Sequence, residues 1–495
     1  MRIIYTSDTH SYLFPTLYFE RGERNMGLMR ICESFESDED MVVIDGGDTI
    51  QGSALSKYVF DRKKCPFPQA EIFRRMGLSL AVPGNHDFNY GYDVFKTFFS
   101  QTGATVLAAN VRDLTGGINI VPHVIMTDSD GLRVAFAGVV TSFVNVWEKS
   151  ENIRNFEITS AFEAAKREYE ILKGQADILV LIYHGGFEND IATGRVLSET
   201  GENEGYRMCM ELGYDLLLSA HQHMVIQPTL VSGTMILQVG ANAMNYADIR
   251  LSSSGINAAI REPDEYGAHN LEKEYSALND DINRWLDRSV ATIPEEIKAP
   301  GLLESALNGS RIADFFNFVQ LSVSGADISC TSLANKLYGF SRDITIREVI
   351  ASYQYPNTLE VIEVGEAELR FALERAAEYF DYSDGRVSIS KSFLEPKIEN
   401  YNYDYYLGLS YTFDLRKPAG HRVTRLLYEG AELGGKRLRL CLNNYRASGT
   451  GGYDVFRECR KISSLNLDIQ DLAVSFLLSH GGDITWPKAD FTCIC

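Results

Sequence analysis

The chain has 495 residues, more than one hydrophobic core usually supports, so two domains are expected. Hydrophobic residues make up 45% of it and charged residues 23%, which is ordinary for a globular protein and argues against global disorder. The formal net charge of −20 disfavours a nucleic-acid polymer as partner, because such a surface repels a polyphosphate backbone. A small phosphorylated ligand is compatible with this charge, since bound metal ions can reverse the local field.

The beginning of the chain shows no basic and then apolar signal region, because an apolar strand pattern starts at once with Ile3. No stretch approaches the roughly 20 apolar residues of a membrane span. We therefore expect a cytoplasmic protein that does not bind a membrane. The sequence does not indicate the oligomeric state.

The first half of the chain alternates short apolar runs with amphipathic stretches. Five apolar runs predict buried strands, at residues 3–5, 41–44, 80–82, 178–182 and 216–218. Three amphipathic stretches predict helices, at residues 27–35, 91–99 and 160–172. This alternation is typical of a layered α/β domain, which we place at residues 1–265.

After Arg261 the composition becomes charged and polar. Apolar side chains at helical spacing predict a connecting helix over 271–286, inside a linker that spans 266–298. A segment with two prolines, 293–301, marks the approach to a second domain at 299–495. In that domain, helices are predicted over 302–323, 346–352 and 366–379, and a strand over 326–329.

Five of the nine histidines lie at the ends of the predicted strands, together with several carboxylates. The motifs are Asp8-Thr9-His10, Gly47-Asp48, Gly84-Asn85-His86-Asp87, His184 and His221-Gln222-His223. Side chains at the carboxyl ends of adjacent strands converge on one rim of a sheet. The motifs therefore predict a metal site.

Side chains two residues apart share a face of a strand, so Asp8 and His10 are predicted to bind one ion together. His221 and His223 repeat this spacing. A lone carboxylate such as Asp48 can bridge two ions. Two ions about 3.5–4 Å apart would clamp an in-line displacement at phosphorus.

Asn85 and His184 supply further neutral donors. Mixed ligation by Asp, Asn and His suits borderline ions better than Ca²⁺ or Mg²⁺. The expected cofactors are therefore two divalent metal ions, Mn²⁺, Zn²⁺ or Fe²⁺.

In this order, the motifs resemble the signature of calcineurin-like metallophosphoesterases. The architecture of the whole chain resembles the 5′-nucleotidase family, which adds a C-terminal nucleotide-binding domain. The resemblance implies a layered αββα sandwich, then an α+β substrate-binding domain. It also implies one metal held by Asp8, His10, Asp48 and His223, and a second held by Asp48, Asn85, His184 and His221.

The resemblance assigns His86 to catalysis, where it would stabilise the transferring phosphoryl oxygen or protonate the leaving alkoxide. Asp87 either orients a neighbouring loop or touches substrate. Members that act as 5′-nucleotidases or UDP-sugar hydrolases usually read Gly-Asn-His-Glu-Phe-Asp, and the last Asp partners the catalytic His. Here Asn89 occupies that position.

An amide oxygen can accept the imidazole N–H, but it cannot stabilise an imidazolium as a carboxylate does. His86 is therefore expected to be less basic than in those members. The version with Asn89 resembles relatives that act on 2′,3′-cyclic nucleotides and 3′-nucleotides.

Two segments of the second domain, 353–358 and 443–453, resemble the family's substrate loops. Both place a Tyr where a base could stack, and a Gly-rich stretch lets the backbone approach a ligand closely. The candidate substrate-binding residues are Tyr355, Asn357, Tyr445 and Gly449. Residues 330–333 read Cys-Thr-Ser-Leu rather than the Gly-Gly-Ile-Arg of many 5′-nucleotidases, so an arginine for the substrate's phosphate is expected to be missing.

The leading hypothesis is two-metal hydrolysis of nucleotide phosphoesters, by a 2′,3′-cyclic nucleotide 2′-phosphodiesterase with 3′-nucleotidase activity. A 5′-nucleotidase or UDP-sugar hydrolase is the alternative enzyme. A hypothesis of another class is a nucleotide-binding protein that has lost catalysis. Degenerate ligands would mark such a protein, yet every expected ligand position holds a competent residue.

Overall fold

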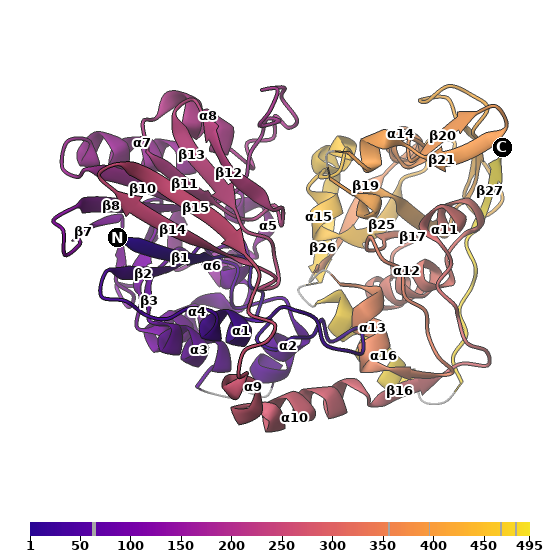
Figure 1. Ribbon diagram of the computed structural model, residues 1–495. Helices are drawn as coiled ribbons and strands as arrows, with labels where there is room; N and C mark the ends of the chain where they lie inside the picture. The colour runs from indigo at the N-terminus through magenta and orange to yellow at the C-terminus, as the bar shows by residue number, and fades with distance from the viewer. Residues whose placement is uncertain (62–65, 355–356, 396, 466–467, 481–482) are drawn as a thin grey trace. The chain divides into compact units, whose positions relative to one another are not determined.

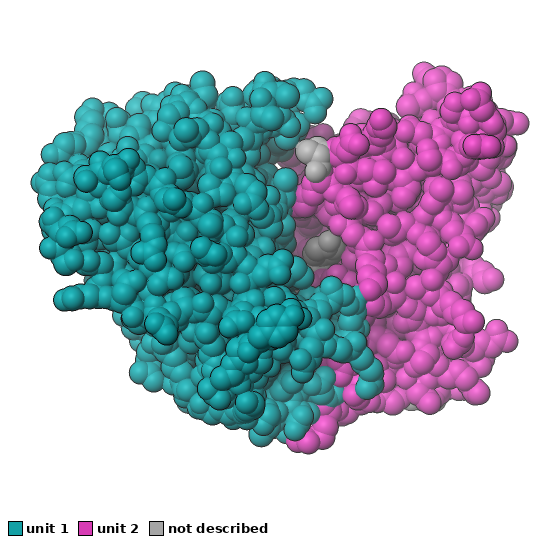
Figure 2. All heavy atoms as spheres, viewed as in Figure 1, with its two compact units in different colours: residues 1–283 teal, residues 284–495 magenta. Residues whose placement is uncertain are grey.

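The computed structural model describes residues 1–61, 66–354, 357–395, 397–465, 468–480 and 483–495 (Figure 1). The chain divides into two compact units, residues 1–283 and 284–495 (Figure 2). The boundary falls inside helix α10 (Ser276–Leu286). The single helix predicted over 271–286 is split at Tyr275 into α9 (Asn270–Glu274) and α10.

Unit 1 is built on two sheets. The seven-stranded sheet has the order β15-β14-β1-β2-β3-β4-β6, and the six-stranded sheet the order β12-β13-β11-β10-β8-β7. The strands of the first are β1 (Arg2–Thr6), β2 (Met41–Asp45), β3 (Leu78–Ala81), β4 (Thr105–Leu107), β6 (Ile120–Val121), β14 (Tyr246–Ser252) and β15 (Gly255–Arg261). Those of the second are β7 (His123–Thr127), β8 (Arg133–Val140), β10 (Ile178–His184), β11 (Leu216–Ser219), β12 (Ile226–Val231) and β13 (Thr234–Gln238). A separate pair joins β5 (Val111–Asp113) to β9 (Phe156–Ile158).

The two sheets pack face to face around one buried cluster. Ile3, Tyr5 and Ile44 of the first sheet lie in the same cluster as Val180 and Ile182 of the second. Alternate residues along each strand point inward, as the pleat requires. Burial of so much apolar surface is the main stabilising contribution to this unit.

Helices cover the outer faces of both sheets (Figure 1). Those beside the seven-stranded sheet are α1 (Leu28–Glu33), α3 (Pro68–Met76) and α4 (Gly91–Thr102), and those on the six-stranded sheet are α7 (Ala161–Leu172) and α8 (Gly205–Glu211). Shorter helices are α2 (Ala54–Asp61), α5 (Val144–Trp147), α6 (Ser150–Ile153) and the 3₁₀ helix η1 (Asn85–Phe88). The αββα layering implied by the sequence is thus confirmed.

The strand pairing brings the motifs to one rim. β1, β2, β3 and β4 run parallel, and so do β8, β10, β11 and β13, so their carboxyl ends point the same way within each sheet. Loops that leave these ends form the candidate site.

Unit 2 contains a mixed five-stranded sheet in the order β22-β17-β25-β19-β26. Its strands are β17 (Ile328–Ser332), β19 (Leu359–Val364), β22 (Asp404–Leu407), β25 (Leu438–Asn443) and β26 (Arg460–Leu465). The smaller sheets use β16 (Ser289–Thr292) with β18 (Asp343–Thr345), β20 (Phe380–Ser383) with β21 (Arg386–Ile389), and β23 (Ser410–Asp414) with β24 (Val423–Leu427) and β27 (Asp490–Ile494). The helices are α11 (Leu302–Asn308), α12 (Arg311–Ser324), α13 (Ile346–Ser352), α14 (Glu366–Ala377), α15 (Asn444–Ala447) and α16 (Ile469–His480), with 3₁₀ turns η2 (Lys391–Phe393), η3 (Asn400–Asn402) and η4 (Asp454–Glu458).

The long helix predicted over 302–323 is wrong, because two helices occupy this stretch. Gly309 has a φ of 89°, which ends α11, and the Ser310 side chain accepts a hydrogen bond from the Ala313 N–H to begin α12. None of the helices among the described residues combines the length and apolarity that a bilayer crossing requires.

Tyr5 links the two sheets, and this contact yields a stability prediction. Its hydroxyl donates a 2.9 Å hydrogen bond from β1 to the Ser219 carbonyl oxygen at the end of β11. Tyr5→Phe leaves that carbonyl without its partner, so unit 1 is expected to lose about 1 kcal/mol of unfolding free energy. Hydrogen exchange of peptides from β1 and β11 should then speed up roughly fivefold. Tyr266→Phe is the control, because this side chain is 90% exposed; equal exchange in both variants would contradict the prediction.

Candidate metal centre

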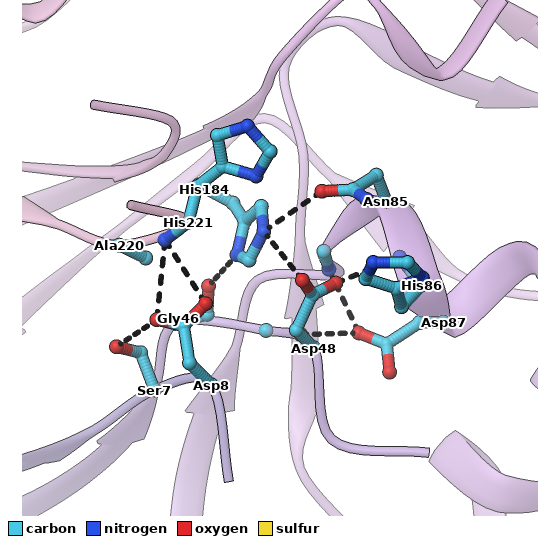
Figure 3. Close-up of polar contacts among 12 residues, drawn as sticks. Ser7, Asp8, Gly46, Asp48, Asn85, His86, Asp87, His184, Ala220 and His221 are labelled. Atoms are coloured by element: carbon cyan, nitrogen blue, oxygen red, sulfur yellow. Dashed lines mark hydrogen bonds and ion pairs between the residues drawn. The ribbon is translucent and has the colours of Figure 1, made fainter. Parts of the chain in front are cut away.

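Two groups of potential ligand atoms share Asp48 at the rim of the sheets. Figure 3 shows Asp48 with Asp8, Asn85, His184 and His221. One group is Asp8, His10, Asp48 and His223, and the other is Asp48, His184 and His221. Within each group, the atoms lie within 4.8 Å of one another. Asn85 joins the second group, with its Oδ1 3.2 Å from His184 Nε2. The structure therefore brings together every residue that the sequence offered as a metal ligand.

The local geometry at Asp8 and His10 differs from the one we predicted. β1 ends at Thr6, so the two residues lie in a loop and not on one face of a strand. Both adopt left-handed backbone conformations, with φ of 50° and 47°. The neighbouring loop holds them there, because the Asp8 N–H donates to the Gly47 carbonyl and the His10 N–H to the Asp48 carbonyl. Asp8 and His10 fall in one group of potential ligands, although not through the strand geometry that we expected, and their shared ligation of an ion stays a prediction.

The second histidine pair repeats this arrangement. His221 and His223 follow the end of β11, with φ of 74° and 56°. Gln222 between them points away and exchanges two hydrogen bonds with the backbone of Phe187, at 2.9 and 3.2 Å. Left-handed conformations at non-glycine residues cost about 1–3 kcal/mol each and persist where surrounding contacts enforce them. Here those contacts direct His223 to the first ligand group and His221 to the second.

Glycines allow two loops of the site to touch through their backbones. Gly47 has a φ of 98°, and a Cβ placed there would lie 2.3 Å from the Gly84 nitrogen. A Cβ on Gly84 would lie 2.2 Å from Asp48 Oδ1. Any side chain at either position would separate Asp48 from Asn85. This explains why Asp48 and Asn85 each follow a glycine.

Asp87 orients the loop that carries Asp48. Its buried carboxylate accepts four backbone N–H groups, from Gly84 at 2.7 Å, Asp48 at 3.0 Å, Thr49 at 2.9 Å and Ile50 at 2.8 Å. Burial raises the pKa of Asp87 to about 6, and repulsion from Asp48 adds to the rise while the N–H donors oppose it. Of the two roles that the sequence left open, the contacts favour loop orientation.

In two of the ligand histidines, a backbone carbonyl determines which ring nitrogen carries the proton. His184 Nδ1 lies 2.6 Å from the Gly46 oxygen, and His10 Nδ1 lies 2.7 Å from the Gln51 oxygen. A carbonyl only accepts, so Nδ1 carries a proton in both rings and Nε2 is the nitrogen that faces the site. Such second contacts fix the ring orientation that a metal ligand needs.

The charge balance of the site fits divalent cations. Burial lowers the pKa of His184, but the Asp48 carboxylate outweighs it, with further help from Asp8, and raises that pKa to about 10. Asp48 Oδ2 is buried and forms an ion pair with His184 Nε2 at 3.3 Å. His10 Nε2 and His223 Nε2 lie only 2.9 Å apart. Buried carboxylates and ring nitrogens that face one another favour a bound cation, and a set of Asp, Asn and His donors is suited to divalent metal ions.

His86 lies beside the shared ligand. Its backbone N–H donates to Asp48 Oδ1 at 2.7 Å, and its ring is half-buried near that of His10, with centroids 5.6 Å apart. His86 Nδ1 is 2.8 Å from Asn89 Oδ1, so the amide oxygen does accept from the imidazole, as the sequence suggested.

Three residues of the site escaped the sequence reasoning. Glu202 Oε1 lies 3.0 Å from His221 Nε2, which leaves Nδ1 of that ring for a metal. The Trp147 ring stacks on the same imidazole, with centroids 5.5 Å apart. Glu148 binds Asn89. All three lie outside the strand-end motifs, and no spacing in the sequence marks them.

The proposed substrate loops of unit 2 lie side by side. β19 pairs antiparallel with β25, with Leu359 opposite Asn443, and the Asn444 N–H donates to the Thr358 carbonyl at 2.9 Å. This pairing puts the segments that contain Asn357 and Tyr445 at the same end of the two paired strands. Their contact with substrate stays a prediction.

Gly449 and Tyr355 are the other two candidate substrate-binding residues in these loops. Gly449 has a φ of 88°, which favours glycine. Tyr355 lies outside the described residues.

Comparison with known proteins agrees with this architecture. The family model for the calcineurin-like phosphoesterase matches residues 1–225, and that for the 5′-nucleotidase C-terminal domain matches residues 290–458. A crystal structure of a putative 5′-nucleotidase from Staphylococcus aureus, in complex with alpha-ketoglutarate, is 30% identical. It has a TM-score of 0.91, and the match covers 100% of both chains.

Two curated relatives are more distant in sequence. The 2′,3′-cyclic-nucleotide 2′-phosphodiesterase/3′-nucleotidase of Yersinia enterocolitica is 24% identical, over 91% of this chain and 82% of its own. The trifunctional nucleotide phosphoesterase protein YfkN of Bacillus subtilis is 21% identical over 99% of this chain, which spans 38% of that protein. The fold and the ligand set define a metallophosphoesterase. Within that class, the chain belongs to the 5′-nucleotidase family.

The role of Asp87 can be tested through metal affinity. Asp87→Asn replaces an acceptor of four N–H groups by an amide that can accept at only one atom, so the Asp48 loop should loosen. We expect Mn²⁺ affinity to fall about 10- to 100-fold, as for other groups that orient metal ligands. Competition titration with a chelating dye measures this. Asp93→Asn, an exposed change on the adjacent α4, is the matched control; unchanged affinity in Asp87→Asn would refute the role.

Proposed function

We propose that the protein hydrolyses nucleotide phosphoesters and that 2′,3′-cyclic nucleotides and 3′-nucleotides are its substrates. The observation that carries the proposal is the pair of ligand groups joined through Asp48, with His86 next to them and Asn89 on its ring. Two divalent ions, held by these groups, would supply Lewis-acid stabilisation of the phosphoryl oxygens and lower the pKa of water.

Histidines of the chain would supply the other catalytic contributions. His10 and His184 are held with Nε2 toward the site, so no reorientation is needed when ligand binds. His86 is held with Nδ1 toward Asn89, so Nε2 is free to take up a proton; the protonated ring could then donate a hydrogen bond to the phosphoryl group or pass that proton to the leaving ribose oxygen. Proton donation of this kind contributes about 10²–10⁴-fold to a rate.

Asn89 supports the proposal that the protein cleaves 2′,3′-cyclic and 3′ esters of nucleotides. A neutral amide at this position leaves His86 without the carboxylate partner that is usual in 5′-nucleotidase relatives. The Yersinia enterocolitica relative named as a 2′,3′-cyclic-nucleotide 2′-phosphodiesterase/3′-nucleotidase aligns along most of both chains. Both observations favour cleavage of the 2′,3′-cyclic and 3′ esters.

A 5′-nucleotidase is the second candidate. It is favoured by the Staphylococcus aureus structure, which carries the name putative 5′-nucleotidase and shares 30% identity. The two candidates differ in the ester that is opened, so one assay separates them.

That assay is a panel of phosphate-release and product measurements with Mn²⁺ or Zn²⁺. We expect turnover of 2′,3′-cyclic AMP and 3′-AMP, and little of 5′-AMP. Asp48→Asn should abolish all turnover, because it removes the carboxylate that both ligand groups share. Hydrolysis of 5′-AMP with the other two compounds left intact would overturn the choice and support the 5′-nucleotidase.

Tyr445 is proposed to stack on the base of the substrate. One stacking contact is worth about 1–3 kcal/mol, so Tyr445→Ala should raise KM roughly 5- to 150-fold with little effect on kcat. Tyr445→Phe keeps the ring and is the matched control. Steady-state kinetics on adenine and uracil 3′-nucleotides measure both, and an unchanged KM in Tyr445→Ala would remove Tyr445 from the site.

A further inference from the structure

Glu148 lies between α5 and α6 and reaches the catalytic loop from outside the strand-end motifs. Its carboxylate accepts a hydrogen bond from Asn89 Nδ2 through one oxygen. Its other oxygen accepts from Asn152 Nδ2 at 2.8 Å and from the Lys149 N–H at 2.7 Å. Asn152 Nδ2 also donates to the Asn89 carbonyl at 2.8 Å. The Glu148 carboxylate is thus fixed in place beside Asn89.

This contact determines which way the Asn89 amide points. The two ends of an amide are nearly equal in shape, so their orientation follows from their partners. A carboxylate only accepts hydrogen bonds, so the amide NH₂ must face Glu148 and the amide oxygen must face His86. The 2.8 Å contact from Asn89 Oδ1 to His86 Nδ1 is the result.

The orientation of the amide in turn determines the proton on His86. An amide oxygen only accepts, so His86 Nδ1 carries the hydrogen and Nε2 carries the lone pair in the neutral ring. The reverse amide orientation would present an NH₂ group to Nδ1 and move the ring proton to Nε2.

We propose that Glu148 is a positioning residue that, through Asn89, sets the tautomer and orientation of His86. The Glu148 carboxylate does not contact the imidazole directly, as a carboxylate at position 89 would. Its negative charge acts on His86 through the polarised Asn89 amide that lies between them. The effect of Glu148 on catalysis rests on the proposed function, whereas its effect on the His86 tautomer does not.

The tautomer is tested without any activity measurement. Nitrogen NMR of the full chain labelled with ¹⁵N-histidine reports which ring nitrogen carries hydrogen, and the His86→Gln spectrum identifies the His86 signals by difference. In the metal-free protein we expect hydrogen on Nδ1. Glu148→Gln should shift His86 toward a mixture of tautomers, because the new amide can present either end to Asn89. An unchanged tautomer in Glu148→Gln would overturn the proposal, even if the enzyme assay behaves as expected.

Kinetics with a rescue variant test the catalytic consequence. Glu148→Gln should lower kcat about 10- to 100-fold with KM nearly unchanged. Asn89→Asp alone should also be impaired, because it places two carboxylates in contact. In the double variant that combines Asn89→Asp with Glu148→Gln, the new carboxylate at position 89 accepts from His86, and the new amide at position 148 donates to that carboxylate. We therefore expect kcat to return to within about threefold of the parent.

Comparison of the double variant with each single variant then distinguishes a positioning role of Glu148 from general damage to the fold. A double variant no better than the worse single variant would refute the coupling. Glu157→Gln, which changes an exposed carboxylate on β9, is the matched control and should keep the parental kcat. If the NMR result holds and no variant or parent hydrolyses any nucleotide, the proposed function fails while the positioning role of Glu148 stands.

Discussion

The hydrogen bonds that the buried Asp87 carboxylate accepts from four backbone N–H groups are the constraint on which the site depends. They fold the loop after β2 and the loop after β3 onto each other, with Gly47 against Gly84. Asp48 is thereby placed between two groups of ligands, and the loop that carries it also holds the backbones of Asp8 and His10. A carboxylate outside both ligand groups thus holds the loop that carries their shared member, Asp48.

The sheets provide the rigidity that these strained loops require. The left-handed conformations at Asp8, His10, Asp48, His221 and His223 are each unfavourable alone. The loops begin at strands whose inner side chains lie in one buried cluster, so the strand ends cannot relax without opening the core. A packed interior therefore offsets strain that is concentrated at the metal ligands. Similar placement of strain at functional residues is common in proteins.

Sequence reasoning found the layers and the ligands because both leave local signals. Buried parallel strands are apolar runs, and ligands follow their carboxyl ends. The same reasoning explained Asp8 and His10 wrongly, since nothing local shows that β1 stops at Thr6. It joined α11 to α12 because apolar spacing continues across Gly309. Glu148 and Glu202 act on partners 59 and 19 residues away, through loops whose course only the fold determines.

The central claim is that two metal ions share Asp48, and anomalous diffraction tests it most directly. Crystals soaked in Mn²⁺ should show two anomalous peaks about 3.5–4 Å apart, one on each side of the Asp48 carboxylate. One peak should contact Asp8, His10 and His223, and the other should contact Asn85, His184 and His221. A single peak, or two peaks of which only one touches Asp48, would contradict the account.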